Sequence, residues 1–240
     1  MNKKELGQFF TTNYKYILQK LYIPDDIKNI IEPFTGNGDL LNFIDKEKNK
    51  YNIECYDIDP KKDFIIQKNT INDPPNYNNK FIITNPPYLA RNKAKNKLLY
   101  DKYDVNDLYK CFIKNLITNK CIGGIIIIPL NFWSSIRKTD IDLRKIFLNI
   151  YNIIQLNIFE EQVFEDTTTT VCSFQFILKN NQDINNINIT IYPSNINITT
   201  ILNENNNYTI GGDIYNLQIN NNYKITRLTS KNIDKKIQIY

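Results

Sequence analysis

Histidine is absent from the 240-residue sequence. Its absence excludes catalytic triads built on an imidazole base and most zinc or iron sites, in which histidine is the usual ligand. The four cysteines form no C-x-x-C pair and fall in or beside apolar stretches, at Cys55, Cys111, Cys121 and Cys172. We therefore expect reduced, buried thiols in a cytoplasmic protein without a metal, and not a disulfide framework.

Long apolar runs are also missing. No stretch is long enough to span a bilayer, and residues 1–5 lead into polar sequence, not into the apolar segment of a signal peptide. With 42% hydrophobic residues, the chain has enough apolar side chains for one α/β core and a small appendage.

Short β-branched stretches alternate with amphipathic ones up to about residue 156, which is typical of a doubly wound, mostly parallel sheet. The expected strands are 28–32, 52–57, 80–84, 124–129 and 152–157, and the expected helices are 13–22, 39–46, 106–120 and 139–149. An antiparallel hairpin over 155–178 is expected to close the sheet. After residue 179 the sequence becomes Asn-rich, with β-type pieces at 187–192, 196–202 and 215–219. We divide the chain into a domain of residues 1–179 and a small β-rich region of residues 180–240.

The tetrapeptide Asn85-Pro86-Pro87-Tyr88 follows an apolar strand and carries the strongest functional signal. Two successive prolines fix two φ angles and remove two N–H donors, so the turn is stiff and presents acceptors. The Asn85 side chain and the Pro86 carbonyl can together accept both hydrogens of a planar NH₂ group and direct its nitrogen at an electrophile. Tyr88 offers a flat face on which a ring can stack. An ordinary X-Pro-Pro turn is the alternative.

A glycine turn lies upstream, between the strand ending at Glu32 and the helix expected from Asp39. Glycines at positions 36 and 38 allow a ligand to approach the backbone, but the third glycine of the dinucleotide fingerprint is missing. Asp57 ends the next strand, where a carboxylate can accept from both hydroxyls of a ribose. A pyrophosphate cofactor is therefore disfavoured.

In these motifs and their order, the chain resembles the S-adenosylmethionine-dependent DNA adenine-N6 methyltransferases of restriction-modification systems, from Leu6 to about Leu178. The resemblance implies a Rossmann-like sheet of seven strands, S-adenosylmethionine as cofactor, and double-stranded DNA as partner. It also implies extrusion of the target adenine from the duplex. The segment Gly7 to Thr12 is similar to the family's N-terminal motif, with Thr12 where proline is usual.

The resemblance assigns roles residue by residue. Catalysis falls to Asn85, Pro86, Pro87 and Tyr88, and the target base stacks on Tyr88 and Phe164. The cofactor-binding residues that it implies are Thr11, Glu32, Pro33, Gly36, Gly38, Asp57, Ile58, Asp73 and Phe112. Within this set, Glu32 meets the methionine ammonium, Asp73 accepts from the adenine amino group, and Phe112 packs on the adenine ring.

Structural alternatives remain for several of these residues. Thr11 or Thr12 can simply cap the following helix, Phe112 and Phe164 can be core residues, and Asp73 lies in a turn-forming stretch. A basic loop after the catalytic turn contains Arg91, Lys93, Lys95 and Lys97 and is positioned to contact DNA phosphates, although such loops are often only solvated.

Two other functions compete with DNA adenine methylation. One is methyl transfer to a protein glutamine amide or an RNA base, since the tetrapeptide suits any planar NH₂ group. The other is a non-catalytic DNA-binding specificity protein, which the presence of Glu32, Asp57 and Asn85 disfavours. Residues 180–240 are short for a target-recognition domain, so we expect a reduced or truncated one and a specificity or nuclease partner chain.

Overall fold

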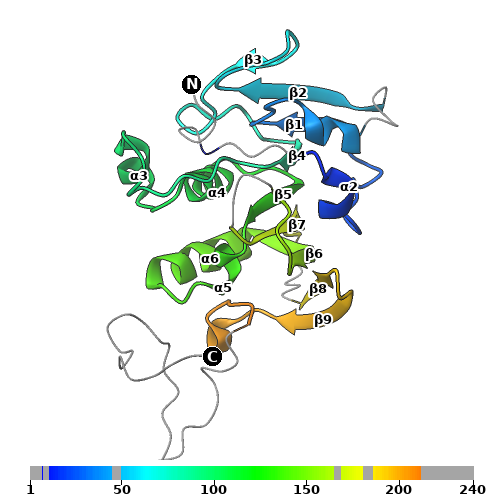
Figure 1. Ribbon diagram of the computed structural model, residues 1–240, viewed down its shortest axis with the longest axis vertical. Helices are drawn as coiled ribbons and strands as arrows, with labels where there is room; N and C mark the ends of the chain where they lie inside the picture. The colour runs from blue at the N-terminus through cyan, green and yellow to red at the C-terminus, as the bar shows by residue number, and fades with distance from the viewer. Residues whose placement is uncertain (1–6, 8–10, 45–49, 165–168, 181–185, 212–240) are drawn as a thin grey trace, which may run out of the picture.

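The computed structural model describes residues 7, 11–44, 50–164, 169–180 and 186–211. These residues form one nine-stranded sheet in the order β3-β2-β1-β4-β5-β7-β6-β8-β9 (Figure 1). The strands are β1 (Asn29–Glu32), β2 (Asn52–Asp57), β3 (Ile66–Gln67), β4 (Phe81–Thr84), β5 (Gly123–Pro129), β6 (Tyr151–Phe159), β7 (Val171–Leu178), β8 (Asn186–Tyr192) and β9 (Ile196–Ile201).

The strands from β3 to β5 are parallel, and β7 runs antiparallel to both β5 and β6. The expected Rossmann-like architecture and its closing hairpin are therefore confirmed. The expected number of seven strands is wrong. β8 pairs in parallel with β6 from Gln155 to Phe159, and β9 pairs antiparallel with β8. Residues 186–201 thus extend the sheet because the outer edge of β6 offers unpaired backbone groups.

Helices cover both faces of the sheet. α4 (Leu108–Thr118), α5 (Asn131–Ser134) and α6 (Lys138–Ile150) lie on one side, and α2 (Tyr14–Ile17) with the 3₁₀ helix η1 (Asp39–Phe43) lies on the other (Figure 1). α3 (Leu98–Tyr103) precedes α4, and a second 3₁₀ helix, η3 (Glu204–Asn206), follows β9. No helix in the described ranges is long and apolar enough to cross a membrane.

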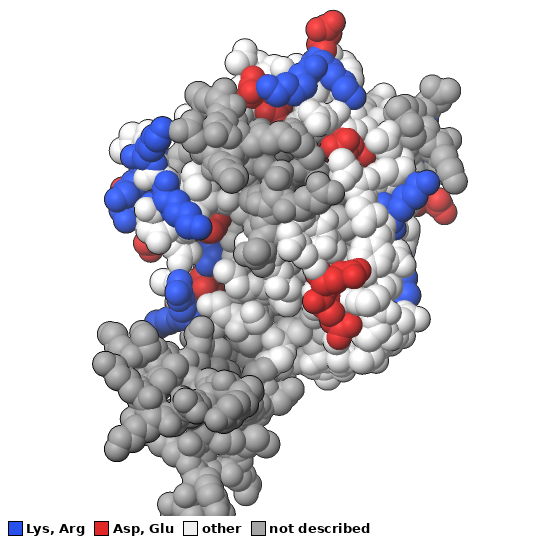
Figure 2. All heavy atoms as spheres, in the orientation of Figure 1, with Lys and Arg blue, Asp and Glu red and all other residues white. Residues whose placement is uncertain are grey.

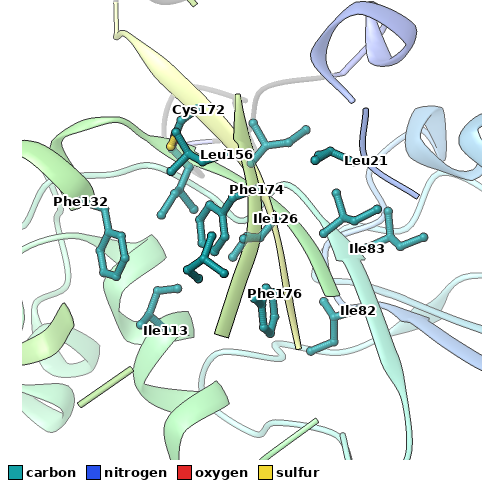
Figure 3. Close-up of a cluster of buried hydrophobic side chains, with 14 of the residues drawn as sticks. Leu21, Ile82, Ile83, Ile113, Ile126, Phe132, Leu156, Cys172, Phe174 and Phe176 are labelled. Carbon is teal, nitrogen blue, oxygen red and sulfur yellow. The ribbon is translucent and has the colours of Figure 1, made fainter. Parts of the chain in front are cut away.

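The core lies around the central strands, because every residue of β4 and β5 is buried. In Figure 3, Ile113 and Phe132 approach these strands from one side and Leu21 from the other. A Cβ atom at Gly124 would lie 2.6 Å from the Ile82 carbonyl oxygen, so only glycine allows β4 and β5 this close packing. The four cysteines are buried free thiols, as expected.

Candidate active site

A cavity of about 680 Å³ opens at the carboxyl ends of the parallel strands. Ligands bind at this edge in open α/β sheets, because the loops that follow the strands converge there. Glu32 ends β1, Asp57 ends β2 and Asn85 follows β4, and all three line the cavity. The predicted residues that the cavity brings together are Thr11, Glu32, Gly36, Asp57, Ile58, Asn85, Pro87, Lys93 and Lys95.

The glycine turn is held by the acid at the end of β2. Gly36 and Gly38 adopt positive φ angles of 53° and 80°, which other residues rarely adopt. The Gly36 amide donates to Asp57 Oδ2 at 2.7 Å, and the Asp59 amide donates to Asp57 Oδ1 at 2.8 Å. Asp57 is only 1% exposed, so its carboxylate fixes the shape of the cavity wall as well as facing the cavity.

Glu32 is 2% exposed, and its Oε2 atom is buried without a hydrogen-bond partner in the described residues. Burial raises the pKa of this carboxyl well above its ordinary value, and repulsion from Asp57 and then from Asp39 raises it further. A buried, unpaired carboxyl is costly unless a ligand supplies a donor or a positive charge. This residue therefore fits the ammonium group of an amino-acid cofactor. The described residues contain no group of His, Cys, Asp or Glu arranged to hold a metal ion.

The Asn85-Pro86-Pro87-Tyr88 turn reaches the cavity at Asn85. Its Nδ2 atom donates to the Thr11 hydroxyl at 3.1 Å, and its Oδ1 atom accepts from the Tyr88 hydroxyl. The Tyr88 hydroxyl also reaches the Ile127 carbonyl oxygen at 2.8 Å. Tyr88 is buried, and its ring meets Tyr109 edge-on at a centroid distance of 6.2 Å. Its predicted stacking on a target base therefore stays a prediction.

Gly7 packs directly on the Asn85-Pro86-Pro87-Tyr88 turn. The Tyr88 amide donates to the Gly7 carbonyl oxygen at 2.8 Å, and Gly7 has a φ of +66°. A Cβ atom at this position would lie 2.6 Å from the Tyr88 carbonyl oxygen. Gly7 and Tyr88, far apart in the sequence, are thus held in direct contact.

The chain after the tetrapeptide is tied to the start of α4. The Leu89 amide donates to Asp107 Oδ1 at 3.1 Å, and the Leu89 carbonyl oxygen accepts from the Tyr100 hydroxyl at 2.8 Å. The Leu108 amide also donates to the Leu89 carbonyl oxygen, at 3.2 Å. Burial raises the pKa of Asp107 to about 6, although Lys110 and backbone amides favour its charged form. These contacts hold the end of the catalytic turn.

Some predicted residues lie outside the cavity lining. Asp73 is paired with Lys68 at 2.8 Å, and 75% of its side chain is exposed. Phe112 is fully buried behind Phe34, whose ring it meets edge-on at 5.0 Å. The other predicted residues that do not line the cavity are Pro33, Gly38, Pro86, Tyr88, Arg91, Lys97 and Phe164.

Sequence reasoning assigned no role to many of the residues that line the cavity, among them Phe34, Asp39 and Asn69. Phe34 lies within the glycine motif, Asp39 directly follows its last glycine, and Asn69 precedes the stretch that contains Asp73. The Asn69 side-chain oxygen accepts from the Asn72 amide at 3.2 Å, so the turn itself orients Asn69. Phe34 and Asp39 could have been predicted from their adjacency to the glycines, but Asn69 carries no pattern of its own.

The basic loop divides into two parts. Arg91 forms an ion pair with Asp101 at 2.7 Å, whereas Lys93 and Lys95 line the cavity. Lys97 precedes α3 and is exposed. Lysine and arginine side chains gather on the part of the surface that carries α3 (Figure 2). Their contact with DNA phosphates stays a prediction.

Solved structures share this fold. A protein from Vibrio vulnificus YJ016 assigned as the modification subunit of a type I restriction enzyme matches with a TM-score of 0.58, 13% identity and 77% of this chain covered. A protein from Listeria monocytogenes assigned as a class I S-adenosylmethionine-dependent methyltransferase matches with a TM-score of 0.54 and 12% identity over 74% of this chain. DrdV, solved in complex with DNA by cryo-electron microscopy, matches with a TM-score of 0.58 and 15% identity over 88% of this chain.

The chain thus has the fold of S-adenosylmethionine-dependent methyltransferases. Proteins described as restriction-modification methyltransferase subunits share this fold, so the resemblance drawn from the motifs is confirmed at the level of the fold. The chain spans 47%, 61% and 32% of the lengths of these three proteins, respectively. No family model and no curated protein sequence matches it.

Proposed function

We propose that this chain is a DNA adenine-N6 methyltransferase of the restriction-modification type that uses S-adenosylmethionine. The observation that carries the proposal is the position of Asn85, because its side chain lines the same cavity as Glu32 and Asp57. The acceptor for a target amino group and the candidate cofactor residues therefore share one space. When bound, S-adenosylmethionine supplies an electrophilic methyl group on a positively charged sulfur.

Individual residues of the chain are proposed to bind the cofactor or to orient the target amino group. Glu32 binds the cofactor ammonium, and Asp57 binds the ribose hydroxyls while keeping the glycine turn in place. Asn85 and the Pro86 carbonyl accept the two hydrogens of the adenine amino group. This orients the nitrogen lone pair toward the methyl group, and the nitrogen loses its proton after transfer. Catalysis on this account depends on orientation and electrostatics, without a covalent enzyme intermediate.

The target base has to leave the duplex, since its amino group is otherwise paired. Tyr88 and Phe164 are the aromatic residues proposed to stack on it, and Tyr88 must first release Asn85 Oδ1. Lys93 and Lys95 are positioned to contact phosphates at the mouth of the cavity, which would make DNA binding strongly salt-dependent.

Target recognition is proposed to need a partner chain. The chain spans about half of the restriction-modification subunit from Vibrio vulnificus that it matches, and residues 180–240 contain a single arginine, Arg227, which lies outside the described residues. Arginine is the usual reader of guanine edges, so this region has few means of reading a sequence.

A transfer assay tests the proposal. The protein is incubated with cofactor labelled in its methyl group and with plasmid DNA, total RNA or a glutamine-containing peptide in separate reactions. We expect label on DNA alone, and none with Asn85→Ala. Label on RNA or peptide without label on DNA would contradict the proposal.

A further inference from the structure

Three carboxylates line the cavity, but only one of them is satisfied by the surrounding chain. Asp57 accepts the Gly36 and Asp59 amides at 2.7 and 2.8 Å. Glu32 Oε2 and Asp39 Oδ2 are both buried and have no hydrogen-bond partner within the described residues. The cavity therefore holds two unmatched acidic oxygens, from two different elements, at the site where a ligand is expected.

The carboxylates of Glu32, Asp39 and Asp57 interact strongly because the protein interior screens charge less than water does. Asp57 and Asp39 both act on Glu32 strongly enough to raise its pKa, in addition to the larger effect of burial. Lys68 lines the same cavity, but its Nζ atom is engaged by Asp73 at 2.8 Å. Lys93 and Lys95 also line the cavity, but the buried oxygens of Glu32 and Asp39 have no hydrogen-bond partner among the described residues, so a proton or a ligand donor is needed to satisfy them.

Asp39 is placed by local geometry. It begins η1 immediately after Gly38, whose left-handed φ of 80° turns the chain at that point. Asp39 lines the cavity together with Glu32 and Gly36, and its Oδ2 atom is buried. The residue is therefore available to the cofactor.

The two forms of the proposed cofactor differ in charge. S-Adenosylmethionine carries a sulfonium, an ammonium and a carboxylate, and has a net charge of +1. After methyl transfer, S-adenosylhomocysteine keeps the ammonium and carboxylate but has a neutral sulfur, so its net charge is zero. A further carboxylate beside Glu32 therefore stabilises bound S-adenosylmethionine more than bound S-adenosylhomocysteine.

We propose that Asp39 acts with Glu32 to make the cavity select positively charged S-adenosylmethionine over uncharged S-adenosylhomocysteine, and so promotes product release. This inference rests on the proposed function, because it takes the cofactor from it. It adds a specificity-determining residue that the motif pattern does not contain.

Isothermal titration calorimetry on the full chain tests the inference. S-Adenosylmethionine, S-adenosylhomocysteine and sinefungin, which carries an amine in place of the sulfonium methyl, are titrated into wild type, Asp39→Asn and Asp39→Ser. We expect both variants to lower the affinity ratio of S-adenosylmethionine to S-adenosylhomocysteine about tenfold, and sinefungin to follow S-adenosylmethionine. Asp63→Asn is the matched control, because Asp63 is exposed and lies outside the cavity lining, and it should leave the ratio unchanged.

The outcomes separate the two proposals. An unchanged ratio in folded Asp39→Asn or Asp39→Ser, with wild type still binding S-adenosylmethionine, overturns the role of Asp39 and leaves the proposed function standing. An equal loss of affinity for both ligands also overturns it, because a role in shape alone would produce that result. Wild-type protein that binds neither ligand contradicts the proposed function itself.

Discussion

The hydroxyl of Tyr88 donates a hydrogen bond to the side-chain oxygen of Asn85, the atom proposed to receive the target amino group. The same hydroxyl reaches the Ile127 carbonyl oxygen at 2.8 Å, so it has a second acceptor when Asn85 is released. The tyrosine therefore orients the asparagine before the target binds, and an amino group has to replace the hydroxyl.

Removing this hydroxyl should slow methylation without affecting the cofactor. Tyr88→Phe keeps the ring but deletes one hydrogen bond, worth about 1 kcal/mol, so we expect kcat to fall about fivefold. Affinity for S-adenosylmethionine should stay within about twofold of wild type by calorimetry. An unchanged kcat would show that Thr11 alone is sufficient to orient Asn85.

Replacing Asp57, the proposed ribose-binding acid, should weaken cofactor binding, whereas Tyr88→Phe should not. Asp57→Ala removes the proposed acceptor for two hydroxyls and also the acceptor of the Gly36 amide, so cofactor affinity should fall by about 1–3 kcal/mol in binding free energy. Asp63→Asn serves as the control, because that acid is exposed and lies outside the cavity lining. Equal affinities for wild type and Asp57→Ala would move the ribose site elsewhere.

Gly7 should be intolerant of any side chain. In Gly7→Ala the new Cβ atom meets the Tyr88 carbonyl oxygen at 2.6 Å, and the residue also has to keep a positive φ. We expect the free energy of unfolding to fall by about 1–3 kcal/mol and methylation to be lost.

Comparison with Gly211→Ala separates the effect of the positive φ from the effect of the contact with Tyr88. Gly211 has a similar φ of +73°, but a Cβ atom there has no neighbour within 4 Å. Both variants are compared by urea denaturation. Equal losses of stability would mean that backbone strain explains the effect and that the contact with Tyr88 does not matter.

Asp107 should make stability depend on pH. Its pKa rises from 3.8 to about 6 in the folded protein, mainly through burial, so the folded state binds this proton more tightly than the unfolded state. Its stabilising contribution is complete below about pH 4 and is lost as the pH rises to about 6. The loss is about 1–3 kcal/mol. Urea denaturation between pH 4 and 6.5 should show a smaller decline for Asp107→Asn than for wild type, and parallel curves would refute the assignment.

Much of the fold could be predicted from sequence because apolar periodicity marks buried strands directly. β1, β2, β4 and β5 lie within about a residue of their expected bounds. The attachment of β8 and β9 to the same sheet could not be predicted, since the pattern of a half-buried strand does not say which edge it joins. The β-type piece expected at 215–219 lies outside the described residues.

Several predicted residues line the cavity because the backbone itself places them there. Gly36, Asp57 and Asn85 follow strands, and the topology brings strand ends together. Side chains on later turns were harder to place. Asp73 and Asn69 lie in one turn, where a shift of four residues decides which of them faces the cavity, and neither periodicity nor spacing fixes that choice.

Mass spectrometry of nucleosides tests the central claim most directly. Plasmid DNA lacking prior methylation is incubated with S-adenosylmethionine and wild type or Asn85→Ala, then digested and analysed. We predict N6-methyladenine with wild type and none with Asn85→Ala, while calorimetry shows that the variant still binds the cofactor within about threefold of wild type. Methylation of cytosine only, or N6-methyladenine made equally by both proteins, would contradict the claim.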